Sequence, residues 1–167
     1  KHVYGAWKTV RKSTALVAGY SQRTCKGCGK TEQKKLAKLV PTGSLNMTSI
    51  PLKVKQKTTA LKVSGLASGD YIKVYTSSNK KIFTVTKKGK ITAVKAGKAV
   101  LTVKLASGKQ LKAKVKVQKG TVKTSKVTVA ERSKVLKKGK SYKIKALISP
   151  LTSQEKVTYS TSNKKVA

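Results

Sequence analysis

The residues of this chain best suited to metal or thiol chemistry are two cysteines and a histidine. Cys25 and Cys28 form a Cys-Lys-Gly-Cys motif, and His2 is the single histidine of the 167 residues. Thiolate and imidazole are ligands of zinc, but a tetrahedral zinc site takes four ligands and these residues supply three. Three states therefore stay open for the pair: a local disulfide, a partial zinc site that includes His2, and two free thiols. In an oxidising exterior we expect the disulfide.

Carboxylates are too few for acid–base or calcium chemistry. The four acidic residues are Glu32, Asp70, Glu131 and Glu155, scattered among 40 lysines and arginines. Hydrolysis by paired carboxylates needs two acids held together, and calcium needs clustered oxygen ligands. A nucleophile paired with a base has only His2 to draw on. The sequence therefore predicts a protein that is not an enzyme and uses no cofactor.

The chain carries an extreme positive charge, formally +36, with an isoelectric point near 10.5. Such a field attracts polyanions, including nucleic acid, anionic wall polymers, acidic glycans and phospholipid surfaces. The basic residues are mostly lysines spread along the whole chain, whereas a nucleic-acid surface more often concentrates arginine and aromatic side chains on one face. We therefore expect weak, salt-sensitive binding to anionic cell-wall polymers or acidic glycans. A dedicated polyanion-binding module, for nucleic acid or acidic polysaccharide, is the alternative.

No stretch of the sequence is long and apolar enough to span a bilayer. The first residues, KHVYGAWK, contain neither an initiator methionine nor an apolar signal core. We therefore interpret the sequence as a piece of a longer polypeptide, whose other domains are among its partners, and we expect no membrane span within this piece.

Alternation of apolar and polar residues with a period of two predicts an all-β fold. Residues 99–105 alternate in this way, and residues 111–117 do so again after the turn ASGK, with lysine at every second position. Such a pair is a hairpin with one buried face and one solvated face, on which lysine is the outward residue. Further short strands are predicted at residues 52–56, 59–63, 72–76, 82–86 and 91–94. Seven or so short strands favour an antiparallel sandwich.

The inward positions of this alternation should be mostly buried. They are Leu61, Val63, Val74, Ile82, Val85, Ile91, Leu101, Val103, Leu111, Val115 and Val117. Residues 31–39, TEQKKLAKL, permit either a strand or a helix too short to be stable alone. We expect Tyr4 and Trp7 to form a small N-terminal core rather than to stack on a base or sugar ring.

The sequence repeats itself with a spacing of 84 residues. The octamer YTSSNKKI at residues 75–82 returns as YSTSNKKV at residues 159–166, and residues 54–63 resemble residues 137–146 at nearly the same spacing. Self-similarity at a fixed period marks a repeated structural unit. The second copy stops where later strands are due, so it would expose a sheet face and unpaired edges. We expect residues 120–167 to be poorly ordered, paired with another chain, or completed by further sequence.

Residues 44–118 resemble the group 2 bacterial immunoglobulin-like domain. The matching elements are Tyr75, the Ser-Ser-Asn turn at 77–79, the apolar strand at 82–85, the Gly-turned segment at 89–93 and the segment KAGKAVLTV at 95–103. Phe83 stands where the family commonly has alanine, and Lys73 stands where the second copy has Val157. Either departure could shift the register of a strand. The resemblance implies tandem immunoglobulin-like antiparallel β-sandwiches, one at residues 44–119 and a truncated one at residues 120–167.

Residues 1–43 resemble a short cysteine-containing module found beside such domains in secreted proteins of clostridial-type bacteria. The matching residues are His2, Tyr4, Trp7, Arg23, Cys25, Cys28, Gly29 and Glu32. Ala15 stands where the pattern has its first cysteine, and no histidine follows Gly43. The resemblance implies a small β-rich CxxC module, and the two departures argue against a complete zinc site.

These features together favour a non-catalytic spacer and surface-interaction region of a larger secreted or cell-wall-associated bacterial protein, an enzyme or an adhesin. The expected location is extracellular, secreted or on the cell surface. The cationic faces would then associate with the anionic polymers named above.

Overall fold

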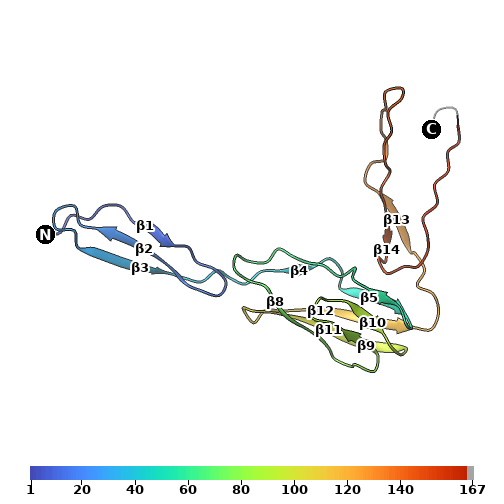
Figure 1. Ribbon diagram of the computed structural model, residues 1–167, viewed down its shortest axis with the longest axis horizontal. Coiled ribbons are helices and arrows are strands. Elements are labelled where there is room, and N and C mark those ends of the chain that lie inside the picture. Colours follow the sequence, from blue (N-terminus) through green and yellow to red (C-terminus); the bar gives the residue numbers. More distant parts are fainter. Residues whose placement is uncertain (165–167) are drawn as a thin grey trace.

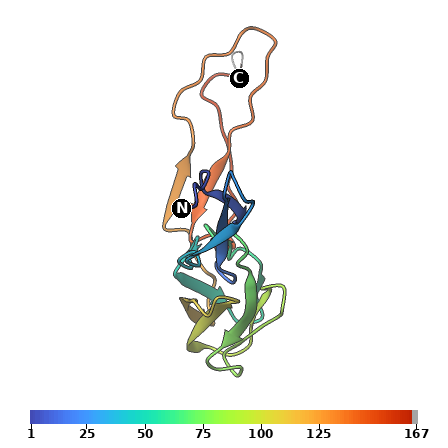
Figure 2. The ribbon, with the colours of Figure 1, turned by 90° about the vertical axis from the view of Figure 1, so that its left-hand side faces the viewer.

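The computed structural model describes residues 1–164, and every regular element among them is a β-strand (Figure 1). The all-β prediction is confirmed. The strands fall into three groups in chain order: an N-terminal sheet, a central sandwich and a C-terminal hairpin, which follow one another in Figure 1. Figure 2, seen from the N-terminal side, shows the hairpin extending away from the sandwich. None of the described residues belongs to a helix that could span a membrane.

The N-terminal sheet is antiparallel, with the strand order β1 (Lys8–Arg11), β2 (Gly19–Thr24), β3 (Thr31–Leu36). β2 and β3 pair along their whole length, from Gly19 opposite Leu36 to Thr24 opposite Thr31. Of residues 31–39, which permitted either a helix or a strand, residues 31–36 therefore form a strand. A helix of nine residues has little stability of its own, whereas β2 supplies backbone partners for every residue of β3.

The central sandwich contains a three-stranded and a four-stranded sheet, plus a small pair. The three-stranded sheet has the order β6 (Lys57–Thr58), β10 (Ile91–Ala93), β9 (Phe83–Val85). The four-stranded sheet has the order β5 (Ser49–Lys53), β12 (Gln110–Gln118), β11 (Gly97–Leu105), β8 (Ile72–Ser77). The small pair is β4 (Ser44–Leu45) with β7 (Val63–Ser64).

The sandwich is antiparallel except at one edge, where β5 runs parallel to β12. This corrects the expectation of a wholly antiparallel arrangement. Parallel neighbours need a long crossover connection, and here the strands β6 to β11 lie between β5 and β12 in the sequence.

One hydrophobic core lies between the two sheets. Its buried residues are Ile50, Leu52, Leu61, Phe83, Ile91, Ala93, Ala99, Leu101, Val103, Leu105, Ala113, Val115 and Val117. Of the expected core, Leu61, Ile91, Leu101, Val103, Val115 and Val117 are buried, while Val63, Ile82, Val85 and Leu111 are partly buried against it. Period-two alternation thus identified the core of the β11–β12 hairpin, where the strands are long and regular.

Val74 is exposed, contrary to expectation. A β-bulge in β8 explains this, because Leu105 pairs with Ile72 while the adjacent Lys104 pairs with Val74. Lys73 is the extra residue. The bulge turns Ile72 towards the core and leaves Val74 on the outer face beside Lys104, as expected when one inserted residue exchanges the faces of a strand.

Two predicted strands have other boundaries in the structure. Residues 59–62 lie between β6 and β7, because the chain there leaves the three-stranded sheet, where β6 pairs with β10, for the small pair, where β7 pairs with β4. The strand predicted at residues 52–56 ends at Lys53, because the chain then turns, with the Gln56 N–H donating to the Lys53 carbonyl at 3.0 Å.

That turn recurs 84 residues later. The Lys140 N–H donates to the Lys137 carbonyl, also at 3.0 Å, as Gln56 does to Lys53 in the first copy. The third residue of each turn has positive φ, 70° in the first copy and 79° in the second. The second copy has glycine at this position, which takes positive φ without steric cost, whereas the first copy has a lysine.

The same two-stranded pairing also occurs in both copies. β4 pairs with β7, with Leu45 opposite Val63. In the C-terminal hairpin β13 (Lys126–Val129) pairs with β14 (Ala146–Ser149), with Val129 opposite Ala146. These positions correspond with a shift of 84 residues on the first strand and 83 on the second, the one-residue offset visible in the sequence.

The repeated octamer begins the same way in both copies. The Asn79 N–H donates to the Ser77 hydroxyl at 3.2 Å, and the Asn163 N–H donates to the Thr161 hydroxyl at 3.1 Å. The last two residues of the second octamer lie outside the described residues. This hydrogen bond, like the turn and the strand pairing above, is therefore common to both copies.

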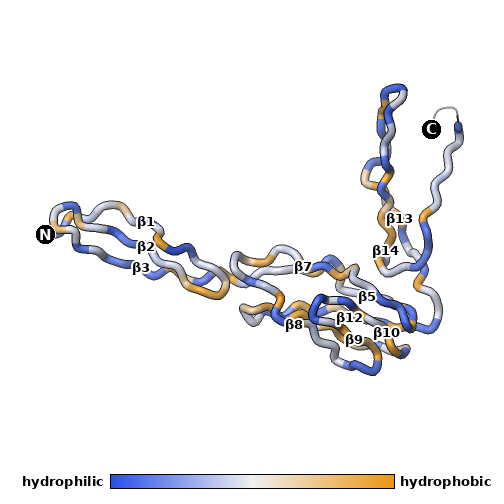
Figure 3. Tube along the Cα trace, viewed as in Figure 1, coloured by the Kyte–Doolittle hydropathy of each residue, from blue (hydrophilic) through white to orange (hydrophobic). Residues whose placement is uncertain are grey.

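The C-terminal hairpin exposes the apolar side chains of Val127, Val129 and Leu147. All of β13 is exposed, and between residues 120 and 164 the buried side chains are those of Val122 and Thr152. Hydrophobic residues appear on this hairpin as well as in the central sandwich (Figure 3). How residues 120–167 are completed stays a prediction.

Asp70 joins the start of β8 to the turn between β11 and β12. Its carboxylate accepts hydrogen bonds from the Ser107 hydroxyl at 2.6 Å, the Ser107 N–H at 3.1 Å and the Tyr71 N–H at 2.9 Å. These donors, the Ser107 hydroxyl foremost, hold the pKa of Asp70 below its ordinary value because they favour the charged form.

We expect Asp70→Asn to reduce the loss of folding stability that occurs as the pH is lowered into the acid range. A lowered folded-state pKa means that the carboxylate stabilises the fold above the ordinary Asp pKa of about 3.9, and that this contribution disappears as the pH falls through the folded value. As the pH is lowered from 6, the midpoint temperature of thermal unfolding should therefore fall more steeply in the unaltered chain than in Asp70→Asn. Equal steepness would contradict this assignment.

Candidate metal-binding cluster and cationic sheet face

The structure brings His2, Cys25 and Cys28 together. Their ligand atoms all lie within 4.8 Å of one another, and the Cys28 Sγ is 3.2 Å from the His2 Nδ1. The first residues of the chain reach this point because Tyr4 forms a β-bridge with Cys25 and the Lys26 N–H donates to the Val3 carbonyl at 2.9 Å. Both cysteines are free thiols here, with Cys25 buried and Cys28 exposed.

The cysteines lie on the tight turn between β2 and β3. The Cys25 N–H donates to the Lys30 carbonyl at 2.8 Å, and the Gly29 N–H donates to the Cys25 carbonyl at 3.1 Å. Hydrogen bonds from the backbone N–H groups of Cys28 and then Gly27, followed by the His2 side chain, lower the pKa of Cys25 to about 6. These hydrogen bonds favour the thiolate form of Cys25, which is the form that reacts and binds metals.

An aromatic and charged cluster supports this end of the sheet. The Arg23 guanidinium lies over the rings of Tyr4 and Trp7, at 4.5 and 4.7 Å from their centroids. It also forms an ion pair with Glu32, its cross-strand neighbour, at 2.6 Å. Arg23 lowers the pKa of Glu32, while burial and then the hydrogen bond to Glu32 raise the pKa of Tyr4. The eight residues that match the N-terminal pattern thus gather at one end of one small sheet.

Two expectations about this module need correction. Trp7 is 41% exposed, so it is covered by the Arg23 guanidinium on one side rather than buried in a core. Ala15 lies at the far end of the sheet, in the turn between β1 and β2, where its N–H donates to the Ser68 carbonyl of the central sandwich at 2.9 Å. The length of β2 places it roughly 15 Å or more from Cys25. A cysteine at position 15 would therefore not complete the cluster.

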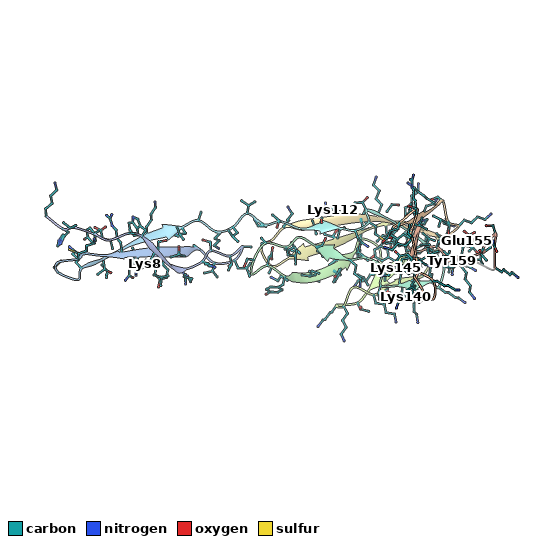
Figure 4. The ribbon with its side chains drawn as sticks, turned by 90° about the horizontal axis from the view of Figure 1, so that it is seen from above. Lys8, Lys112, Lys140, Lys145, Glu155 and Tyr159 are labelled. Atoms are coloured by element: carbon teal, nitrogen blue, oxygen red, sulfur yellow. The ribbon has the colours of Figure 1, made fainter. Side chains whose placement is uncertain are left out.

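Five lysines form a second candidate site, on the outer surface of the β11–β12 hairpin. This lysine face consists of Lys98, Lys104, Lys112, Lys114 and Lys116, all exposed, while the residues between them on β12 and most of those on β11 point into the core. Lys112 lies at the outer edge of the central sandwich in the view of Figure 4. Successive lysines on β12 are about 6.8 Å apart, because residues that share a face are two strand positions apart.

The charge of the lysine face is not compensated within the described residues. Each carboxylate is engaged elsewhere: Glu32 with Arg23, Asp70 with Ser107, Glu131 with Lys134, and Glu155 with the Thr124 N–H. The register also places Lys98 directly opposite Lys116. Like charges facing each other across two strands repel, so an external anion would relieve a repulsion that the fold itself leaves in place. The sequence indicated Lys104, Lys112, Lys114 and Lys116 as outward residues. It did not indicate Lys98, nor that the lysine face is isolated from the acids, which depends on contacts distant in sequence.

No protein-family model and no curated protein matches this chain. Among solved structures it is similar to S-layer protein SbsC. The matches include a crystal structure of domains 4 and 5 (22% identity, 60% of this chain and 66% of that chain), a structure of domains 1–6 (18%, 68% and 18%) and rSbsC(31-844) (19%, 68% and 18%). Each has a TM-score of 0.41, a coarse likeness from which nothing about function follows.

Proposed function

We propose that this chain is a non-catalytic spacer and surface-interaction region of a larger secreted or cell-wall-associated bacterial protein. In this proposal the lysine face associates with anionic wall polymers or acidic glycans on the outside of the cell. The observation that carries the proposal is the uncompensated row of lysines on β11 and β12. A polyanion neutralises that row and releases counterions, which makes binding favourable and salt-dependent.

The proposed units are a CxxC module at residues 1–43, a group 2 bacterial immunoglobulin-like domain at residues 44–119 and a second such domain at residues 120–167. Support comes from the recurrence of one turn and one strand pairing in both of the later segments. Copies joined in series extend a chain by a fixed length per unit, which suits a spacer.

The described chemistry also favours a role without catalysis. The carboxylates have structural partners: Asp70 accepts a hydrogen bond from the Ser107 hydroxyl, and Glu32 forms an ion pair with Arg23. A general acid or base must instead be free to reach a substrate.

The alternative function is a dedicated polyanion-binding module, for nucleic acid or acidic polysaccharide. Sheets that bind single-stranded nucleic acid combine basic groups with aromatic side chains on which bases stack. The described outward residues of β11 and β12 between the lysines are instead Val100 and Thr102. The composition of this face therefore favours attraction by charge over recognition of bases.

The two functions differ in how binding responds to salt. The test measures binding of the chain to a teichoic-acid polymer, hyaluronan and single-stranded DNA as sodium chloride rises. For a spacer with a cationic face we expect the affinities for all three to fall together, with log K falling linearly against log salt. One polymer that stays bound at a salt concentration that releases the other two would favour the dedicated module instead.

A further inference from the structure

The cluster of His2, Cys25 and Cys28 has no part in binding polyanions. We propose that it binds one zinc ion through both sulfurs and the His2 imidazole, with the fourth coordination position open. Two thiolates and an imidazole form the donor set that zinc prefers. The inference is independent of the function proposed above, because the cluster lies on the N-terminal sheet and the lysine face on the central sandwich.

The spacing of the donor atoms suits a single ion. Zinc bonds of about 2.3 Å to sulfur and 2.0–2.1 Å to nitrogen hold tetrahedral donors roughly 3.5–3.8 Å apart. The three donors lie within 4.8 Å of one another, and Cys28 Sγ and His2 Nδ1 are 3.2 Å apart, so binding requires each pair of donors to change its separation by about 1 Å at most. His2 and Cys28 are exposed side chains and can make this adjustment, while the buried Cys25 stays fixed in the turn.

The position of His2 distinguishes a metal site from a disulfide. A disulfide across Cys25 and Cys28 needs only those two residues. The backbone nevertheless carries the start of the chain across to the turn, through the bridge of Tyr4 with Cys25 and the bond from the Lys26 N–H to the Val3 carbonyl. This pairing places the imidazole beside the sulfurs, where a metal ion uses all three groups.

Neighbouring residues restrict where the imidazole can lie. The His2 ring packs at 5.8 Å from the Tyr4 ring, and the Tyr4 ring lies under the guanidinium of Arg23, which forms an ion pair with Glu32. Such outer partners orient metal ligands in known sites. The residues of the N-terminal pattern then have a common role, since Tyr4, Arg23 and Glu32 position the ligand and the turn positions the thiolates.

A fourth protein ligand is not present in the described part of the cluster. Three protein ligands plus one exchangeable position is the arrangement of open zinc sites. Water, or a donor atom of another molecule, completes the shell. The bound ion would join the first residues of the chain to the β2–β3 turn.

The test uses the reduced, metal-free 167-residue chain titrated with cobalt(II) alone and then with zinc(II). We expect one cobalt per chain, thiolate-to-cobalt charge-transfer absorption and the strong visible bands of a four-coordinate ion, all abolished when zinc displaces cobalt. Mutation of a residue that only orients a metal ligand typically lowers metal affinity by roughly 10–100-fold. Because His2 is a proposed ligand itself, His2→Ala should weaken cobalt binding by at least that factor. Cys28→Ser should remove part of the charge-transfer band. Lys26→Ala, which changes an exposed residue between the cysteines, is the matched control.

The proposal fails if the unaltered chain shows no thiolate-to-cobalt absorption, or if His2→Ala binds cobalt as tightly as the unaltered chain does. It fails too if chain prepared without reductant contains no zinc, has no titratable thiol and has a mass two protons lower, because the pair is then a disulfide. Amide hydrogen exchange of β2 and β3 in each variant shows whether the sheet is intact, so that a loss of binding is assigned to the ligand and not to unfolding.

Discussion

Phe83→Ala is expected to destabilise the central sandwich by about 3–5 kcal/mol. Phe83 lies on β9 with no exposed surface, and it is the largest of the fully buried side chains. Its removal leaves a cavity between two sheets that cannot close without moving strands. A single domain of this size has a total stability of only about 5–15 kcal/mol, so the loss is a large share. Urea unfolding should show a lower midpoint with an unchanged slope.

Thr84→Ala is the matched control, because Thr84 is the next residue of β9 and is exposed. It should change stability by no more than about 0.5 kcal/mol. The pattern that residues 44–119 resemble commonly has alanine in place of Phe83, so Phe83→Ala returns this position to that pattern. Equal midpoints for Phe83→Ala and Thr84→Ala would mean that the core does not depend on Phe83.

Gly19→Ala is expected to disrupt the pairing of β1 with β2. A methyl group at Gly19 would lie 2.3 Å from the Arg11 carbonyl oxygen and 2.7 Å from the Ser13 nitrogen. Both are backbone atoms, so no side-chain rotation relieves the clash. The cost should exceed the roughly 1–3 kcal/mol typical of overpacking. Hydrogen exchange should show the amides of β1 and β2 losing protection while those of β11 and β12 keep theirs.

Gly27→Ala is the control for this prediction. Gly27 lies on the cysteine turn of the same sheet, and a methyl group there would meet nothing within 4 Å. Its amide protection pattern should match that of the unaltered chain. If Gly19→Ala also kept full protection in β1, the close approach at this position would not be a constraint on the sheet.

The sequence predicted the long hairpin of the sandwich best. Alternation over β11 and β12 is regular for nine residues on each strand, so it specifies both the buried face and the lysine face. It failed at β8, where the bulge at Lys73 exchanges the faces and exposes Val74. A bulge depends on the partner strand, and a short strand offers too few residues to reveal it. The parallel pairing of β5 with β12 is equally a property of the whole sandwich.

The candidate cluster was predictable in its members but not in its geometry. Cys25, Cys28 and His2 are the cysteines and the histidine of the chain, and the structure brings them together. The suggestion that position 15 belongs with them was wrong, because Ala15 lies at the other end of the sheet. Its contact with Ser68 joins two units and has no local signal in the sequence. The bond between Asp70 and Ser107 was missed for the same reason, since it links two turns far apart in the chain.

The most direct test of the account compares two triple variants in binding a teichoic-acid polymer at several salt concentrations. One variant changes Lys112, Lys114 and Lys116 of the lysine face to glutamine. The control changes the exposed Lys140, Lys143 and Lys145 of the C-terminal segment, so both variants lose the same charge. The slope of log K against log salt is negative. We expect its magnitude to decrease by about 2 in the first variant, which is about 0.7 for each lost phosphate contact, and by much less in the control. Equal losses in the two variants would contradict the lysine face as the site of association.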